Sequence, residues 1–166
     1  MSHKELLNND AKYLEELENI MSASISDTDS CTTKRMHFNC LLSCMQKTEK
    51  EMHTVIEQLH SNNKQLLQNV LKEKNTNWKE HKWQAVFTLQ RKLVHEIYQY
   101  MFQFENMIYD PNNYHLTDDE DICTFTKNAI TYQVFTFRSI QRLKEAHSDL
   151  YCYLILNDKL SEEKNS

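Results

Sequence analysis

The chain contains no glycine, and its only proline is Pro111. At average usage, glycine would occur roughly a dozen times in a chain of this length. Glycine supplies the backbone conformations that tight turns and phosphate-binding loops require, whereas proline interrupts helices. A chain without glycine and with one proline can form long helices but few elaborate loops. The sequence therefore favours an all-α fold and argues against most nucleotide-binding and catalytic folds.

Residues 31–74 and 83–109 show apolar side chains at alternating spacings of three and four, which is typical of a coiled-coil seam. We therefore predict that 31–109 form a long helical hairpin with its corner near 75–77, although one continuous helix through 72–82 is the alternative. The first seam consists of Phe38, Leu41, Met45, Thr48, Met52, Val55, Leu59, Asn62, Leu66 and Asn69. The second consists of Trp83, Val86, Gln90, Leu93, Ile97, Tyr100, Phe104 and Met107.

The ends of the chain complete the expected architecture. Residues 4–23 read as an amphipathic helix, and the acidic, serine-rich stretch up to residue 30 reads as a linker, since Ser, Thr and Asp compete for backbone hydrogen bonds. Pro111 lies in an expected loop, 110–117, and Thr117 and Glu120 have the spacing of a capping box. A long last helix, 118–160, and a frayed tail, 161–166, should follow. The predicted fold is an elongated bundle of about four helices, two of them very long.

Apolar and aromatic side chains are more numerous than one helical hairpin can cover, so we expect a partner chain to bury part of them. The heptad seam is the candidate interface. A polar residue in such a seam selects register or partner, unless the seam opens and the residue is solvated, and Asn62 and Asn69 both pose that choice. The candidate interface residues are Phe38, Leu41, Met45, Met52, Val55, Leu59, Asn62, Leu66, Trp83, Val86, Leu93, Ile97, Tyr100 and Phe104.

The sequence offers little for catalysis or metal binding. His37, Cys40 and Cys44 share one helical face and could supply three zinc ligands, but a structural zinc site usually needs a fourth. Two small cysteines beside the seam and a solvated histidine are the simpler interpretation. No nucleophile with a base and no phosphate cradle can be argued from the pattern. We therefore expect a non-enzymatic protein without catalytic residues, cofactor or metal.

Charge and cysteine usage bear on partners and compartment. The net charge is −5, and the middle segment is only moderately basic between acidic ends. This falls short of the charge pattern of nucleic-acid-binding proteins, so nucleic acid is not the expected partner. Lys72, Lys74, Lys79 and Lys82 are candidates for contact with an acidic polymer such as a microtubule. The absence of a long apolar run predicts no membrane insertion. Five cysteines and a polar N-terminus indicate a cytoplasmic protein, unless a signal peptide was removed.

In length, seam regularity and lack of glycine, residues 36–157 resemble the short helical subunits of spindle complexes, such as augmin and kinetochore assemblies. The resemblance implies a coiled-coil subunit that pairs with other coiled-coil subunits in a cytoskeletal complex active in mitosis and cell division. It transfers no functional residue. The alternative is a secreted four-helix cytokine that binds a cell-surface receptor, since DTDSCTTKRMHFNCLL is similar to the start of the second helix in interleukin-15-like cytokines.

Overall fold

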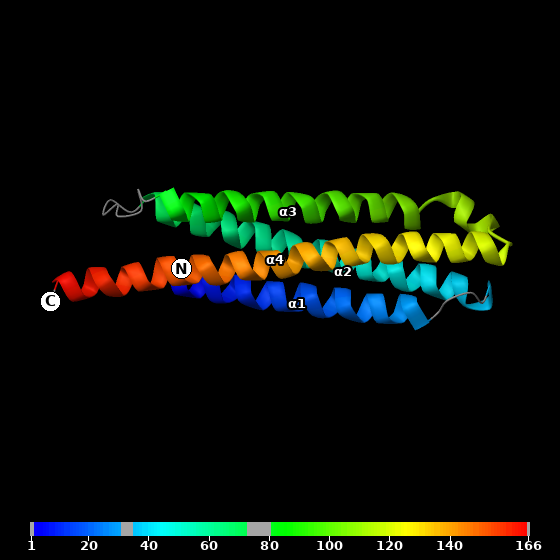
Figure 1. Ribbon diagram of the computed structural model, residues 1–166, viewed down its shortest axis with the longest axis horizontal. Helices are drawn as coiled ribbons and strands as arrows, with labels where there is room; N and C mark the ends of the chain where they lie inside the picture. The colour runs from blue at the N-terminus through cyan, green and yellow to red at the C-terminus, as the bar shows by residue number, and fades with distance from the viewer. Residues whose placement is uncertain (1, 31–34, 73–80, 166) are drawn as a thin grey trace.

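Helices account for nearly all of the regular structure in the computed structural model, which describes residues 2–30, 35–72 and 81–165 (Figure 1). Side chains are described for these ranges except 30, 35–37, 81–83 and 156–165. Within these ranges the chain forms four α-helices, one 3₁₀ helix and no strand, so the prediction of an all-α fold is confirmed. The elements are α1 (His3–Ser30), α2 (Arg35–Lys72), α3 (His81–Ile108), η2 (Pro111–His115) and α4 (Asp119–Asn165).

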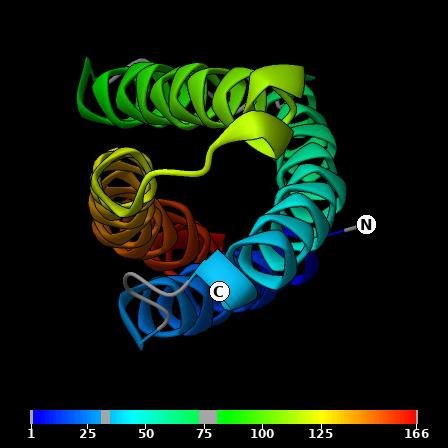
Figure 2. The same ribbon diagram turned by 90° about the vertical axis from the view of Figure 1, so that its right-hand side faces the viewer.

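Consecutive helices run antiparallel, and the four helices follow one another around a ring when seen end-on (Figure 2). Two hydrogen bonds fix the direction of α2 against α3, because Gln46 reaches the carbonyl of Ile108 and Asn63 reaches Gln90. Residue numbers thus fall along α3 as they rise along α2. The chain reverses direction between Lys72 and His81, so the alternative of one continuous helix is wrong. The expected corner at 75–77 lies outside the described residues.

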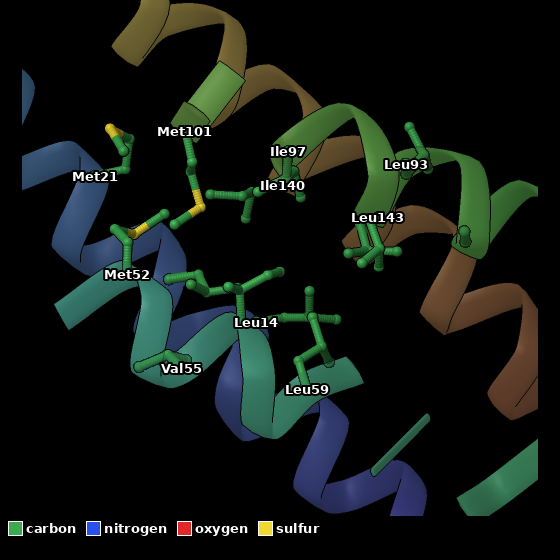
Figure 3. Packing of buried hydrophobic residues seen from close by; sticks show 14 residues of the cluster. Leu14, Met21, Met52, Val55, Leu59, Leu93, Ile97, Met101, Ile140 and Leu143 are labelled. Atoms are coloured by element: carbon green, nitrogen blue, oxygen red, sulfur yellow. The ribbon is translucent and has the colours of Figure 1, made fainter. Parts of the chain in front are cut away.

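The core is a file of three apolar clusters along the long axis of the bundle. The central cluster takes side chains from all four helices, as Figure 3 shows for Leu14, Val55, Ile97 and Leu143 among others. A second cluster, with Leu6, Leu66, Phe87 and Leu150 among its members, extends the core toward the N-terminus of α1. The third packs α2, α3 and α4 at the opposite end with Phe38, Leu42, Met45, Phe104, Ile108, Ile122 and Phe125 among its members.

The first helix is longer than predicted, because α1 continues to Ser30 through the stretch that reads as a linker. Ser24 and Thr28 are buried there, and the Thr28 hydroxyl donates a hydrogen bond to the Ser24 carbonyl at 2.8 Å. The side-chain amide of Gln133 in α4 donates to the Ser24 hydroxyl at 2.7 Å and to the Thr28 hydroxyl at 3.2 Å. These tertiary bonds satisfy the polar side chains, so their preference for turns does not end the helix.

The helix starts also differ in detail from the prediction. At α4, the side chain of Asp118 accepts from the backbone N–H of Glu120 at 3.0 Å, so Asp118 rather than Thr117 caps the helix. At α1, Ser2 accepts from the backbone N–H of Glu5 at 3.2 Å, a cap that the spacing Ser-x-x-Glu could have indicated.

The remaining two differences lie on either side of α4. The predicted loop 110–117 contains η2, whose first turn is capped by Asp110 through the N–H of Asn112. At the other end, α4 continues through 161–165, where we expected a frayed tail. That stretch contains no glycine or proline that would end the helix.

Truncation of Leu59 should test the intramolecular core. Leu59 is 3% exposed in the central cluster, so Leu59→Ala should lower the free energy of unfolding by about 2–5 kcal/mol. Leu71→Ala is the matched control, because Leu71 lies on the same helix and is 64% exposed. Urea denaturation followed by circular dichroism measures both changes. Equal effects of the two substitutions would contradict this assignment of the core.

Candidate functional site

The predicted interface residues form the protein's own core rather than an open surface. Phe38, Leu41, Met45, Met52, Val55, Leu59, Leu66, Leu93, Ile97 and Phe104 are all buried within the bundle. Val86 and Tyr100 are half-buried, and Tyr100 packs on Phe135 of α4 with ring centroids 5.5 Å apart. The side chain of Trp83 lies outside the described residues. These seam positions are covered by the same chain, so a partner is not required to bury them.

Asn62 connects α2 to α1 inside the protein. Its side-chain amide donates to the Leu6 carbonyl at 2.6 Å and to the carboxyl group of Asp10. The neighbouring Asn63 donates to Asp10 at 3.4 Å and to Gln90 of α3 at 2.7 Å. This polar network joins three helices at one level of the bundle. Asn62 therefore sets the register of the chain's own helices rather than the choice of a partner.

Asp10 is 1% exposed, and its burial raises the pKa of its carboxyl group to about 6, although the hydrogen bonds from Asn62 and Asn63 act in the opposite direction. Asp10 and His147 line one small cavity. The His147 ring lies against the Leu7 carbonyl, with Nε2 2.8 Å from the oxygen. Burial lowers the pKa of His147, which favours the neutral ring. A neutral imidazole can still donate one N–H, here to the Leu7 carbonyl. The network is thus sensitive to pH through two buried groups.

One groove of about 570 Å³ lies between α1 and α2 and is lined almost wholly by polar side chains. A more apolar groove of about 550 Å³ lies between α2 and α3. Its walls combine apolar and basic side chains, and none of the described residues that line it is acidic. They are His60, Asn63, Lys64, Leu67, Gln68, Leu71, Arg91, Val94, His95 and Tyr98. The hydrogen bond between Asn63 and Gln90 links the two helices here, and Leu71 is 64% exposed at the rim.

A stripe that runs along α3 to Tyr109, the residue directly after this helix, extends the groove along the bundle. Arg91, His95, Tyr98, Phe102 and Tyr109 follow one another at spacings of four, three, four and seven residues, which places them on one helical face. Phe102 is 63% exposed and Tyr109 is 39% exposed, so the stripe presents aromatic surface to solvent. We call the groove and this stripe together the α2–α3 surface. Part of the aromatic excess noted in the sequence is exposed here, and Tyr114 in η2 and Phe135 in α4 expose further aromatic surface.

Farther along the same surface, α2 and α3 bring together two carboxylates and an imidazole. Glu49 and His53 are one helical turn apart on α2, with Oε1 and Nε2 3.0 Å apart. Glu105 of α3 places its Oε2 3.8 Å from the same Nε2. Glu49 is buried, and this burial together with the charge of Glu105 raises its pKa, whereas His53 lowers it. Among the described residues, these three side chains form a group whose donor atoms are close enough together to hold a metal ion.

The other sequence candidates are not brought into one site. Cys40 and Cys44 are exposed, and the side chain of His37 lies outside the described residues. Lys72 is exposed at the end of α2. Lys74 and Lys79 lie outside the described residues, as does the side chain of Lys82, so the polymer-contact prediction stays a prediction.

Only part of the α2–α3 surface is predictable from the sequence. The aromatic residues of α3 are visible there, but their outward direction depends on which face α4 and α2 cover. The Glu49 and His53 spacing of four was a readable signal, since such residues share a helical face. Glu105 could be added only once the register of α3 against α2 was known.

Replacing Asp10 should remove part of the pH dependence of stability. The carboxyl pKa is about 6 in the folded protein against 3.8 for the ordinary group, so stability falls as the unfolded chain ionises first between these values. Between about pH 4 and about pH 7, the free energy of unfolding of the wild type should fall by about 3 kcal/mol more than that of Asp10→Asn. His147 titrates in both proteins and cancels in the comparison. Urea titrations across this range measure the difference, and parallel curves would contradict the assignment.

Comparison of the chain with protein-family models, with curated proteins and with solved structures gives no match. Among the described residues, no helix is long and apolar enough to cross a membrane.

Proposed function

We propose that this protein is a non-enzymatic structural subunit of a multiprotein complex, and that its α2–α3 surface binds an amphipathic helix of another subunit. The observation that carries the proposal is the groove between α2 and α3, with its continuation along α3 through Phe102 and Tyr109. Most other large apolar side chains of the bundle are buried in the internal core, although Leu89, Tyr114 and Phe135 are also exposed. A helix laid along this surface would cover apolar side chains that the chain leaves in water.

The charges of the groove specify the chemistry of the partner helix. Lys64 and Arg91 are exposed on opposite walls, and the imidazoles of His60 and His95 lie beside them. Apolar side chains such as Leu67 and Val94 lie between them. A complementary helix carries leucine-like side chains on one face, flanked by Asp or Glu that meet Lys64 and Arg91. Such complementarity mainly supplies specificity and rate of association.

We propose the cytoskeleton as the setting of this complex, because long antiparallel helices and the absence of glycine are shared with the short helical subunits of spindle assemblies. The secreted cytokine is the second candidate, and the helix order speaks against it. Cytokine bundles run up-up-down-down with long crossover connections. Here successive helices alternate in direction, and only residues 31–34 separate α1 from α2 (Figure 1). The described cysteines Cys40, Cys44, Cys123 and Cys152 are free thiols.

Charge reversal in the groove should weaken binding of the partner. Affinity purification of the full chain with mass spectrometry identifies stoichiometric subunits, and peptides covering their amphipathic helices are then titrated onto the purified protein. Lys64→Glu with Arg91→Glu should reduce the affinity of an acidic helix at least about tenfold, a change of about 1.4 kcal/mol. Lys127→Glu with Arg138→Glu on α4 changes the net charge equally and should leave affinity unchanged.

Two results would contradict the proposal. One is recovery of the chain alone, as a stable monomer by light scattering. The other is equal loss of affinity in the groove variant and in the α4 variant, since that would indicate a general charge effect.

The polymer-contact prediction has its own test. Replacement of Lys72, Lys74, Lys79 and Lys82 by Gln should reduce co-sedimentation with microtubules, and raising the salt concentration should reduce wild-type binding in the same way. Lys47, Lys50 and Lys127, together with Lys144, can be replaced as a charge-matched control. Unchanged co-sedimentation of the first variant would remove microtubules from the proposal without affecting the α2–α3 surface.

A further inference from the structure

We propose that Glu49, His53 and Glu105 form a binding site for a zinc-class divalent cation between α2 and α3. The site uses no residue that lines the groove, although Glu105 lies on α3 between Phe102 and Tyr109 of the stripe. It joins two carboxylates and one imidazole from two helices, and each residue offers one donor atom within 4.8 Å of the other two.

The distances between the donor atoms suit a small metal ion. In a tetrahedral zinc site with bonds of about 2.0–2.1 Å, neighbouring donors lie about 3.4 Å apart. The Nε2 atom of His53 is 3.0 Å from Oε1 of Glu49 and 3.8 Å from Oε2 of Glu105, which brackets that spacing. The third pair of donors, from Glu49 and Glu105, lies within 4.8 Å. Glu105 is 43% exposed, so its side chain has room to move toward a bound ion.

Glu49 supplies the observation that points to a ligand. Its side chain is 5% exposed, it is directed at His53, and its Oε1 atom accepts no hydrogen bond. A buried carboxylate oxygen normally receives a hydrogen bond, because leaving it without one costs free energy. The Nε2 atom of His53 lies 3.0 Å away, at ion-pair distance, but it gives this oxygen no hydrogen bond. A cation bound by both atoms would satisfy the oxygen and use a nitrogen lone pair of the His53 imidazole.

The donor set also selects the class of metal. Calcium and magnesium prefer sites built from oxygen alone, whereas an imidazole favours zinc and its neighbours in the first transition row. The two carboxylates neutralise the charge of a divalent ion. His53 and Glu105 are 39% and 43% exposed, so solvent can reach the site and complete the coordination. Binding would clamp α2 to α3 beyond the groove.

The experiment measures binding of Co²⁺, a spectroscopic substitute for Zn²⁺, to the purified full chain. It is carried out in a Cys40→Ser, Cys44→Ser, Cys152→Ser background so that the described exposed thiols do not contribute. One equivalent of Co²⁺ should produce a visible absorption band that Zn²⁺ displaces. His53→Ala should weaken binding at least about tenfold, and Glu105→Gln should also weaken it. His95→Ala removes an exposed histidine of the same surface and should have no effect.

A second measurement separates loss of the site from loss of the fold. Zn²⁺ should raise the thermal midpoint of the background protein and of His95→Ala but not that of His53→Ala, whose circular dichroism spectrum should remain helical. The proposal is overturned if the background protein takes up no Co²⁺ at micromolar concentrations. It is equally overturned if His53→Ala and His95→Ala bind Co²⁺ with the same affinity.

Discussion

The apolar side chains of α2 at three- and four-residue spacings must be removed from water, and the whole bundle is organised around that requirement. α1 covers them along one side, and α3 with α4 closes the ring on the other (Figure 2). Met52, Val55 and Leu59 are each 4% exposed or less. At about 25 cal/mol per Å² of buried apolar area, such burial is the dominant favourable term for a chain that has neither sheets nor disulfides among its described residues. The bundle buries its seam without a partner. A partner chain would therefore contact surface residues that lie outside the seam.

Packing alone would tolerate sliding of one helix past another, because apolar contacts are not directional. The polar network of Asp10, Asn62, Asn63 and Gln90 removes that freedom at one level of the bundle. Its buried members lose their hydrogen bonds if α1 or α3 shifts by a turn, and each loss would cost about 1–3 kcal/mol. The raised pKa of Asp10 shows that this specificity has an electrostatic cost near neutral pH.

Much of the fold was predictable, because three-four periodicity and the single Pro111 mark helices and one break. What periodicity does not specify is what lies opposite a buried face. Asn62 was recognised as a polar residue in a seam, but only the register of α1 decides that it meets Asp10. The linker expected near Ser24 and Thr28 is helical because Gln133, more than 100 residues away in the chain, supplies their hydrogen bonds. Glu105 likewise joins Glu49 and His53 through packing that local sequence does not encode.

The contact between α1 and α4 joins the two ends of the chain, and it has a consequence for biosynthesis. His147 meets the carbonyl of Leu7 across a sequence separation of 140 residues. The antiparallel pairs α1–α2 and α3–α4 involve neighbours in sequence and can assemble early, whereas this closure has to wait until α4 is complete. During translation, Leu6 and Leu7 therefore remain without the helix that finally covers them. During this interval the apolar residues of α1 that α4 later covers are exposed. Chaperones, or a second subunit made alongside it, would bind the nascent chain most readily then.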